Sequence, residues 1–448
     1  MESKSFCSPT IFYEQSYLMG NKKIDFPMFK TVRIILPVTL LLIACNTANN
    51  EMGTSPEILS ADIEKHVTFL AADELNGREA GTADEAVAAN YIADLFRDYG
   101  LEPAGDDRTF FQEFTINTSI LNNPHSTDTT GEKRLSKNVA GLLRGTGDSD
   151  EIIIVGAHYD HLGYGEFGSL YRGETPRIHN GADDNASGTA GLIELAEYLS
   201  KNRPETDVLF LAFSGEEMGL LGSAHYVEEP TVDLDNAIAM INLDMIGRME
   251  ESKLIIFGIG TTADWEDILL VANTDSLNLD LVEDGTGASD HTSFYYKNIP
   301  VLHYFTDTHS DYHRPSDDVE YINYKGIALS MSHLSRVIEY LDTINKEQMA
   351  FIEAPGEQRQ SMRLEGPTLG VLPDYGYDGK GMKITGTNPG QPAANAGLQN
   401  GDVIIGLGGV VLEDIYGYMG ALNTLEKGQL TTITILRDGE EMTLELQL

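Results

Sequence analysis

Hydrophobic positions near residue 60 recur at the spacing of an amphipathic helix. Residues 57–75 and residues 84–100 each place apolar side chains three or four positions apart, which predicts two helices. A glycine-bearing loop at residues 76–82 separates them. Residues 105–136 are polar and irregular, and no strand or helix is expected there.

From residue 138 onward, apolar segments alternate with amphipathic ones. The apolar runs predict strands, and the segments with helical spacing predict helices. Strands that are apolar throughout and alternate with helices indicate an α/β domain, with a mixed, mostly parallel sheet and helices on both faces. The expected strands are residues 138–145, 151–160, 207–215, 237–247, 253–260 and 299–307, and the expected helices are 187–202, 216–229, 263–276 and 322–344.

The pattern changes again toward the C-terminus. Residues 346–364 are polar and predict a linker, which ends a first domain expected at residues 57–345. Residues 365–448 contain short apolar runs between Gly and Pro turns. This texture predicts a small β-rich domain that is long enough to fold by itself.

The N-terminal segment is typical of an export signal. A short basic start precedes the apolar run Ile34–Ala44, which is shorter than the about 20 residues that a membrane-spanning helix needs. The run ends in Leu-Ile-Ala-Cys, which resembles a bacterial lipobox with Cys45 as the acylated residue. Residues 1–45 then comprise a leader that a true start at Met28 would exclude, followed by a lipoprotein signal peptide. Residues 46–56 are expected to form a tether. The alternative is an ordinary buried hydrophobic segment.

On the lipobox interpretation, we expect the protein in the cell envelope. A lipid anchor alone would hold it to the membrane, on the periplasmic or extracellular side. The composition agrees with a soluble body, because 41% of the residues are hydrophobic and a sizeable core can be buried.

The charge and the cysteines exclude several classes of protein. Lys and Arg number 30 against 70 Asp and Glu, a net charge of −40, which excludes the basic surface that nucleic-acid binding requires. The acidic residues are spread along the chain and indicate a solvated acidic surface. Cys7 and Cys45 form no Cys-x-x-Cys pair, so neither a disulfide framework nor a cysteine-ligated zinc site is expected.

Carboxylates and imidazoles gather where expected strands end. In open α/β sheets, sites lie at the carboxyl ends of strands, so this placement favours a functional role. Each segment alone has a simpler explanation, since Asp183 and Asp184 could cap a helix and Glu216 and Glu217 could begin one. Five such segments in one domain are hard to explain as caps. They are residues 156–161, 181–188, 214–219, 242–247 and 309–315.

The residue types in these segments suit metal-dependent hydrolysis. His158 and Asp160 share one face of an extended segment, and a carboxylate commonly holds the second nitrogen of a ligand histidine. Adjacent glutamates, such as Glu216 and Glu217, can divide the roles of ligand and general base. Imidazole and carboxylate groups together are ligands that Zn²⁺ accepts.

The motifs in and directly beside these segments read GAHYDH, GADDNASG, SGEEMGLLGS, NLDMIG and DYHRPSD. In this order they resemble the family 28 metallopeptidases, co-catalytic zinc aminopeptidases related to glutamate carboxypeptidase II, and the resemblance covers residues 57–345. It implies two zinc ions per chain and peptide substrates with a free N-terminus. The ligands it implies are His158 and Asp244 for one zinc, Glu217 and His313 for the other, and Asp184 as a bridge between the two.

The resemblance also implies the catalytic roles. Asp160 would orient His158, and Glu216 would be the general base that takes a proton from water and delivers it to the departing amine. Asp184 rather than Asp183 is the expected ligand, because the family's ligand is the second acid of its segment.

Three histidines compete for the last ligand position. His313 is expected to bind metal in preference to His309 and His291, because the family's ligand histidine precedes a Pro-Ser-Asp turn. His291 is expected to line the cleft and contact substrate without binding metal.

The C-terminal unit has its own resemblance. Residues 392–398, followed by residues 401–404, resemble a bacterial PDZ domain. Leu369, Gly370 and Val371 resemble the loop whose backbone N–H groups hold a peptide's C-terminus while the peptide adds as a strand. Docking of a substrate or partner C-terminus and a purely stabilising module both remain open.

Two other functions are weighed against the aminopeptidase. One is a zinc acyltransferase of the glutaminyl cyclase type, which tends to keep a single zinc, and the presence of His158 argues against it. The other is a non-catalytic PDZ-bearing binding protein, which the complete set of ligands and base makes less favourable.

Overall fold

The computed structural model describes most of the chain after residue 56. The predicted signal peptide with Cys45, the tether at residues 46–56 and most of the predicted linker lie outside the described residues. Among the residues that are described, no helix has the length and apolar character needed to span a bilayer. The described residues are 57–117, 133–171, 173, 175–354, 369–373, 380–387, 391–412, 417–418, 421–422, 425, 427–437 and 439–448.

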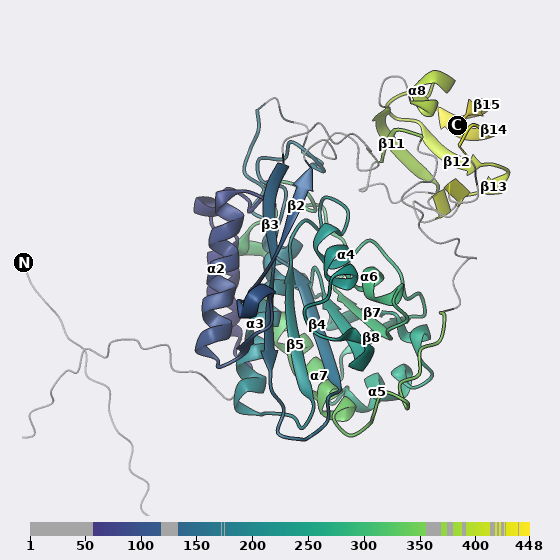
Figure 1. Cartoon of the computed structure of the whole chain (residues 1–448). Coiled ribbons are helices and arrows are strands. Elements are labelled where there is room, and N and C mark those ends of the chain that lie inside the picture. Colours follow the sequence, from purple (N-terminus) through teal and green to yellow (C-terminus); the bar gives the residue numbers. More distant parts are fainter. Residues whose placement is uncertain are drawn as a thin grey trace, which may run out of the picture. The chain divides into compact units, whose positions relative to one another are not determined.

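A mixed sheet forms the centre of the first domain (Figure 1). Its strands are β1 (Glu102–Pro103), β2 (Phe111–Asn117), β3 (Lys133–Leu143), β4 (Ile152–His158), β5 (Asp207–Phe213), β6 (Ala237–Leu243), β7 (Lys253–Phe257), β8 (Asn278–Val282) and β9 (Val301–Phe305). The order is β1-β3-β5-β4-β6-β9-β7-β8, with β2 beside β3. Strands β5, β4, β6 and β9 are parallel, whereas β3 and β7 join this centre antiparallel. The predicted α/β class is confirmed.

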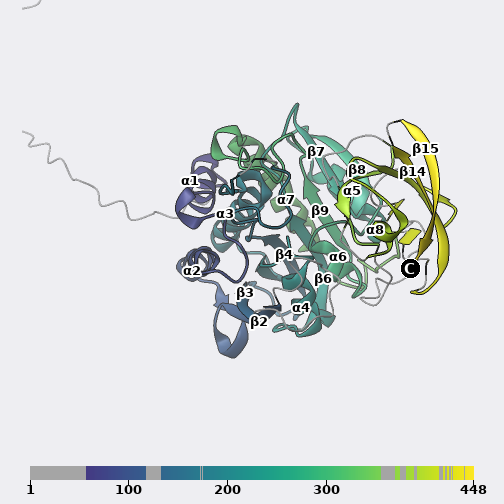
Figure 2. The ribbon, with the colours of Figure 1, turned by 90° about the horizontal axis from the view of Figure 1, so that it is seen from above.

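Helices cover both faces of this sheet (Figure 2). They are α1 (Ser60–Leu70), α2 (Ala83–Asp98), α3 (Gly188–Lys201), α4 (Leu221–Glu228), α5 (Trp265–Ala272), α6 (His291–Tyr295) and α7 (Tyr324–Leu341). Side chains from α1, α2, α3, α5 and α7 form the larger core, and those from α4 and α6 form a smaller core on the opposite face.

Strand β4 shows why the central strands are apolar throughout. Ile152 and Ile154 belong to the smaller core, whereas Ile153 and Val155 belong to the larger one. Successive side chains of a strand point to opposite faces, and both faces are covered by helices here. Every residue of β4 is consequently buried.

The prediction of an irregular segment at residues 105–136 is wrong in part. Strand β2 lies within it and pairs along its whole length with β3. Phe114 and Ile116 are buried while Glu113 and Thr115 are exposed, the alternation of a strand with one covered face. The polar residues on the exposed face hid this strand from an analysis that looked for continuous apolar runs.

The predicted helix at residues 216–229 begins later than expected. Helix α4 starts at Leu221, because Gly219 and Leu220 adopt positive φ angles of 101° and 61° that an α-helix does not contain. Glu216 and Glu217 therefore lie in a turn between β5 and α4.

The first domain also extends further than expected. Met349 is 1% exposed and packs in the larger core, and Ala354 is buried in the smaller core. Residues 346–354 thus belong to this domain, although their mostly polar sequence predicted a linker. The two buried side chains attach them, together with backbone hydrogen bonds from Lys346, Ile352 and Ala354.

The C-terminal unit is a separate β-rich fold. Its elements are β10 (Val371–Pro373), β11 (Met382–Thr387), α8 (Pro392–Ala396), β12 (Val403–Leu407), β13 (Val410–Val411), β14 (Leu430–Arg437) and β15 (Glu440–Gln447). The sheet order is β10-β11-β12-β14-β15, with β13 beside β12. Leu369, Ile384, Ile404 and Ile433 are fully buried in a core of its own.

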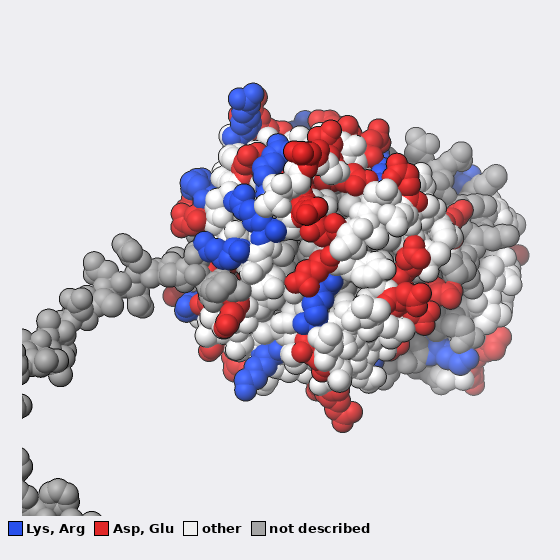
Figure 3. Space-filling model, turned by 90° about the horizontal axis from the view of Figure 1, so that it is seen from below, with Lys and Arg blue, Asp and Glu red and all other residues white. Residues whose placement is uncertain are grey.

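Acidic side chains are spread over the molecular surface. Figure 3 shows one face on which Asp and Glu side chains lie among fewer Lys and Arg side chains. On this face the acidity is dispersed, as expected from its distribution along the sequence.

Candidate metal centre

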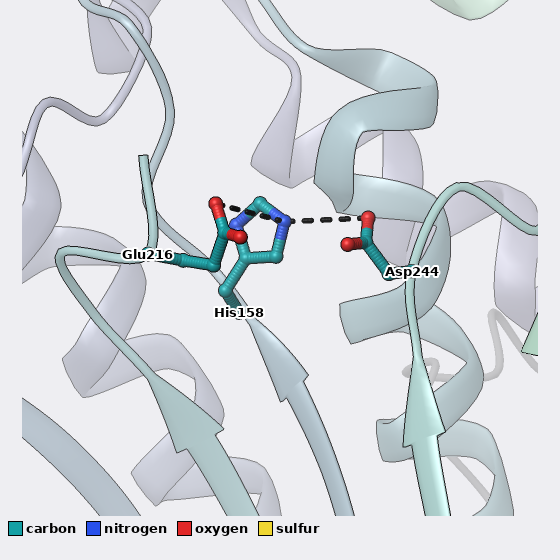
Figure 4. A group of neighbouring side chains, drawn as sticks. All are labelled: His158, Glu216 and Asp244. Atoms are coloured by element: carbon teal, nitrogen blue, oxygen red, sulfur yellow. Dashed lines mark hydrogen bonds and ion pairs between the residues drawn. The ribbon is translucent and has the colours of Figure 1, made fainter. Parts of the chain in front are cut away.

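Three of the predicted residues meet where adjacent strands end. His158 is the last residue of β4, Asp244 follows β6, and Glu216 follows β5. These three strands are neighbours and parallel, so their carboxyl ends lie at one edge of the sheet. Figure 4 shows the three side chains converging, with His158 Nε2 3.3 Å from Asp244 Oδ1 and 4.0 Å from Glu216 Oε2.

The carboxylate of Asp184 lies between two imidazoles. Its Oδ1 is 3.3 Å from His158 Nε2, and its Oδ2 is 3.1 Å from His313 Nε2. Asp184 belongs to the turn that precedes α3, and His313 belongs to the loop that follows β9. One carboxylate thus presents a different oxygen to each of two histidines, the arrangement that a bridging ligand requires.

Glu217 completes the cluster on the side of His313. Its Oε2 is 3.1 Å from His313 Nε2, and its Oε1 is 2.6 Å from His161 Nδ1. The turn before α4 places Glu216 near His158 and Glu217 beside His161 and His313. All five predicted metal ligands therefore lie in one cluster.

The sequence analysis did not select His161. This histidine is 1% exposed, and together with Asp184 and Glu217 it offers ligand atoms within 4.8 Å of one another. His158, Glu216 and Asp244 form a second group of the same kind. The available signal was the position of His161 within the GAHYDH segment.

Asp160 lies next to His158, and its backbone carbonyl is closer to the imidazole than its carboxylate is. His158 Nδ1 is 3.3 Å from the backbone carbonyl of Asp160 and 3.7 Å from its Oδ1. The same Oδ1 accepts a hydrogen bond from the backbone N–H of Glu216 at 3.2 Å. Asp160 therefore contacts both the imidazole and the turn that carries the predicted base.

A second residue supports Asp244. The hydroxyl of Ser289 donates to Asp244 Oδ2 at 2.7 Å and accepts from Asn242 Nδ2 at 2.8 Å. Such outer contacts orient a ligand carboxylate. The sequence analysis assigned no role to either residue.

The three alternatives to the expected ligands, Asp183, His309 and His291, make other contacts. His309 Nε2 is 3.1 Å from Asp183 Oδ2, and Asp183 Oδ1 accepts the backbone N–H of Gly247. His291 is fully buried, and its ring stacks on that of His303 with centroids 4.6 Å apart. Its contact with substrate stays a prediction.

Crowded carboxylates dominate the electrostatics of the cluster. Burial by itself lowers the pKa of His158, but the charges of Asp244 and Glu216 raise that pKa well above its usual value. Burial and the charges of Glu217 and Asp244 likewise raise the pKa of Glu216 well above its ordinary value. Surroundings that stabilise protonated imidazoles this strongly also stabilise divalent cations.

The donor set fits zinc. Imidazole nitrogens and carboxylate oxygens are accepted zinc ligands, and the expected ligands provide two neighbouring positions that share Asp184. The fit rests on the chemistry of the donors and on the placement of Asp184 between them.

A buried arginine joins the loops that carry these ligands. Arg78 is fully buried and donates hydrogen bonds to the backbone carbonyls of Tyr159 at 2.8 Å, Leu70 at 2.7 Å and Gly181 at 3.1 Å. Burial lowers the pKa of its guanidinium to about 10, so Arg78 remains cationic at neutral pH. The sequence analysis saw only a glycine-bearing loop there.

The predicted carboxylate loop of the C-terminal unit is partly described. Leu369 is buried in the core, and its carbonyl accepts the N–H of Ala393 at 2.9 Å. Gly370 has a φ of +67°, and Val371 begins β10. The capture of a peptide C-terminus by this loop stays a prediction.

Two family models match the chain. Residues 138–338 match Peptidase family M28, and residues 359–448 match the PDZ domain. A curated relative, aminopeptidase YwaD of Bacillus subtilis, is 29% identical over 233 residues, which cover 49% of this chain and 45% of the relative. The chain thus spans about half the length of that relative.

Solved structures share the fold of the first domain. BSAP, a zinc aminopeptidase from Bacillus subtilis, has a TM-score of 0.52 at 18% identity over 66% of this chain and 98% of its own. The Bacteroides thetaiotaomicron glutaminyl cyclase has a TM-score of 0.51 at 19% identity, over 63% and 98%. At these identities the likeness shows the fold, and the family assignment comes from the sequence segments. Residues 138–338 thus form a domain of peptidase family M28, and a PDZ domain follows it.

Proposed function

We propose that this protein is an aminopeptidase that removes the N-terminal residue of peptides with the help of two zinc ions. The position of Asp184 carries the proposal. Its two oxygens approach two different histidines, at 3.3 Å for His158 and 3.1 Å for His313. Asp244 would complete one metal site and Glu217 the other, with His161 supporting Glu217.

Zinc bound at these positions supplies Lewis acidity and lowers the pKa of water toward neutrality. Glu216 lies 4.0 Å from the ligand His158, and Asp160 accepts its backbone N–H. Glu216 accepts a proton from the attacking water and then donates it to the nitrogen of the departing amine as the C–N bond breaks. Burial and neighbouring carboxylates raise the pKa of Glu216, the direction that a proton-shuttling carboxyl group requires.

The charge of the cluster supports an exopeptidase that recognises the free N-terminus. Five carboxylates surround the expected reaction centre, and a substrate's α-amine is a suitable partner for such surroundings. These carboxylates are Asp160, Asp184, Glu216, Glu217 and Asp244.

The second candidate is cyclisation of an N-terminal glutamine, and the likeness to a solved glutaminyl cyclase favours it. The two-sided contacts of Asp184 favour the first candidate, because a single-zinc centre does not require one carboxylate between two imidazoles. Zinc content and substrate choice separate the two.

We also propose that the protein is exported and anchored by lipid at Cys45. The sequence pattern of residues 28–45 supports this placement. The PDZ domain would then dock the C-termini of substrates or partners near the membrane surface. Replacement of Cys45 by Ser should release the protein from the membrane fraction, and retention there would contradict the anchor.

The decisive experiment measures metal content and substrate choice together. Residues 46–448 are loaded with zinc, metals are counted by mass spectrometry, and aminoacyl-anilides are assayed beside their N-acetylated forms. We expect two zinc ions per chain, turnover of the free-amine substrates alone, and loss of activity on chelation that zinc restores. One zinc per chain with cyclisation of N-terminal glutamine would establish the second candidate instead. No turnover, with tight binding of C-terminal peptides, would leave a binding protein.

A further inference from the structure

A third group of carboxylates lies between helices α1 and α3. Asp62 on α1 and Glu194 and Glu197 on α3 each offer an oxygen, and these atoms all lie within 4.8 Å of one another. Asp62 precedes the region that matches the peptidase family, residues 138–338. None of the three residues takes part in the strand-end cluster or in the proposed hydrolysis.

The carboxylate of Glu194 is almost fully buried, so both of its oxygens would be expected to have a hydrogen-bond or ionic partner. It is 2% exposed, and Glu197 is 7% exposed. Oε1 of Glu194 accepts the backbone N–H of Leu59 at 2.5 Å, while its Oε2 is buried and has no hydrogen-bond partner among the described residues. A buried carboxylate oxygen without a partner is costly, so a ligand that binds it would stabilise the fold. The side chain reaches into the group, since one of its oxygens lies close to both other carboxylates.

The group keeps a net negative charge. Its neighbouring cation is Lys65, whose Nζ is 2.5 Å from Asp62 Oδ1 and whose side chain is 63% exposed. When all three acids are ionised, one exposed lysine against three carboxylates leaves two negative charges. Burial, then the charges of Glu197 and Asp62, raise the pKa of Glu194 to about 7, against the effect of the Leu59 N–H. Glu194 therefore holds a proton readily near neutral pH, and a cation can take the place of that proton.

The donors select the kind of cation. Three carboxylates without imidazole or thiolate suit a hard cation rather than zinc. Calcium binds oxygens at about 2.3–2.6 Å, so two ligands on opposite sides of one ion lie about 4.6–5.2 Å apart. The three oxygens lie within 4.8 Å of one another, close enough for one ion to contact all of them. Magnesium requires strict octahedral geometry at about 2.0–2.1 Å, whereas calcium accepts the irregular ligand sets that side chains from two helices provide.

We propose that Asp62, Glu194 and Glu197 form a calcium site that ties α1 to α3. The remaining coordination positions would be filled by water, as is common for this ion. The site would brace the start of the domain against the helix that follows the Asp184 turn, since α3 begins at Gly188. The proposal is independent of the peptidase activity, because it involves no residue of the strand-end cluster.

Calorimetric titration of Ca²⁺ into the zinc-loaded protein tests this site. We expect one Ca²⁺ per chain beyond the zinc, and a rise in the thermal unfolding midpoint of about 5 °C at a hundredfold excess over Kd. The isosteric variant Glu194→Gln should weaken Ca²⁺ binding at least about tenfold, because it removes one of three charged ligands. Glu64→Gln, the same charge change at an exposed position of α1, should bind Ca²⁺ as the parent does.

Terbium luminescence locates the bound ion. The hydroxyl of Tyr99 contacts Glu197, so Tb³⁺ in this site should give tyrosine-sensitised emission that Ca²⁺ displaces and that Tyr99→Phe diminishes. The proposal is overturned if millimolar Ca²⁺ does not bind, if Glu194→Gln binds it as tightly as the parent, or if Mg²⁺ binds more tightly. Any of these results would mean that Glu194 is a buried protonated acid and not a calcium ligand. Aminopeptidase activity of Glu194→Gln, measured in parallel, shows that its peptidase domain is folded.

Discussion

The strand-end cluster and the group between α1 and α3 are both rich in buried carboxylates, but their other donors differ. The strand-end cluster combines its acids with His158, His161 and His313, whereas the helix group offers oxygens from acids alone. Imidazole nitrogen favours zinc, and an all-oxygen set favours a hard cation. A cluster of buried carboxylates therefore indicates a cation site, while the presence or absence of imidazole donors determines whether zinc or a hard cation is favoured.

The two regions also differ in the mobility of the cationic side chain that lies near each of them. Arg78 lies fully buried behind the strand-end cluster and is fixed by three backbone segments. Lys65 beside the helix group is 63% exposed and can move aside. A fixed cation positions loops, whereas a mobile one only competes with a bound ion.

Asp184→Asn should have the largest effect. Loss of the bridging charge weakens both zinc positions, so zinc affinity and kcat/KM should fall by more than the about 10–100-fold typical of the loss of an outer contact. Asp183→Asn is the matched control, since Asp183 contacts His309 and Gly247 instead. Metal analysis and anilide assays check this prediction, and greater zinc loss from Asp183→Asn would reverse the choice between the two acids.

Glu216→Gln should lower kcat by about 10²–10⁴-fold and leave the zinc content unchanged, because it removes the proton carrier without removing a ligand. Glu217→Gln should instead lose zinc. Steady-state kinetics with metal counting compare these adjacent glutamates. Retention of activity within tenfold of the parent by Glu216→Gln would exclude it as the base.

Arg78→Lys should weaken zinc binding by about 10–100-fold, because a lysine cannot hold the carbonyls of Tyr159, Leu70 and Gly181 together. Each buried carbonyl left without a donor costs about 1–3 kcal/mol, so the unfolding midpoint should fall as well. Chelator competition measures zinc affinity, and Arg97→Lys at an exposed position of α2 is the control. Lower stability with unchanged zinc affinity would make Arg78 a structural residue only.

The helix group should make stability depend on pH in calcium-free buffer. The pKa of Glu194 is raised from 4.5 to about 7, so between these values the folded chain binds more protons than the unfolded chain. The contribution of this residue to the unfolding free energy therefore falls by up to about 3 kcal/mol as the pH rises through that window. Urea unfolding should show that Glu194→Gln lacks this loss and that calcium offsets it in the parent. Equal pH dependence in both proteins would contradict the buried acid.

Lys65→Met should have the smallest effect. Removal of the competing ammonium group should tighten calcium binding by about twofold to fivefold, the range expected for an exposed ion pair. Calorimetry measures this change, and zinc content provides the control because Lys65 lies away from the strand-end cluster. Weaker calcium binding would show that Lys65 supports the site instead of competing for it.

Local patterns in the sequence were sufficient for the class of fold and for most of the metal centre. The strands of the central sheet are apolar throughout because both faces are covered, so each can be recognised without its neighbours. Several predicted site residues stand at or just after the carboxyl ends of these strands. Because β5, β4 and β6 are parallel neighbours, their carboxyl ends lie together. The resemblance of five short segments then distinguished Asp184 from Asp183 and His313 from His309 as expected ligands.

Other features depended on contacts between distant parts of the chain. Strand β2 is held by pairing with β3, and the turn at Glu216 depends on the positive φ of Gly219 and Leu220. Arg78 contacts a carbonyl 81 positions away, and Leu59 contacts Glu194 across 135 positions.

The sequence by itself determined the α/β class, the order of the ligand segments and the family. Only the tertiary structure decided that His161 joins the cluster, that Arg78 ties its loops together, and that Asp62 lies beside two buried glutamates on α3. The physical reason is the distance along the chain over which each kind of interaction acts. Periodicity and residue type report the local burial of a side chain, whereas hydrogen bonding and charge pairing at a site depend on which distant segments the fold places side by side.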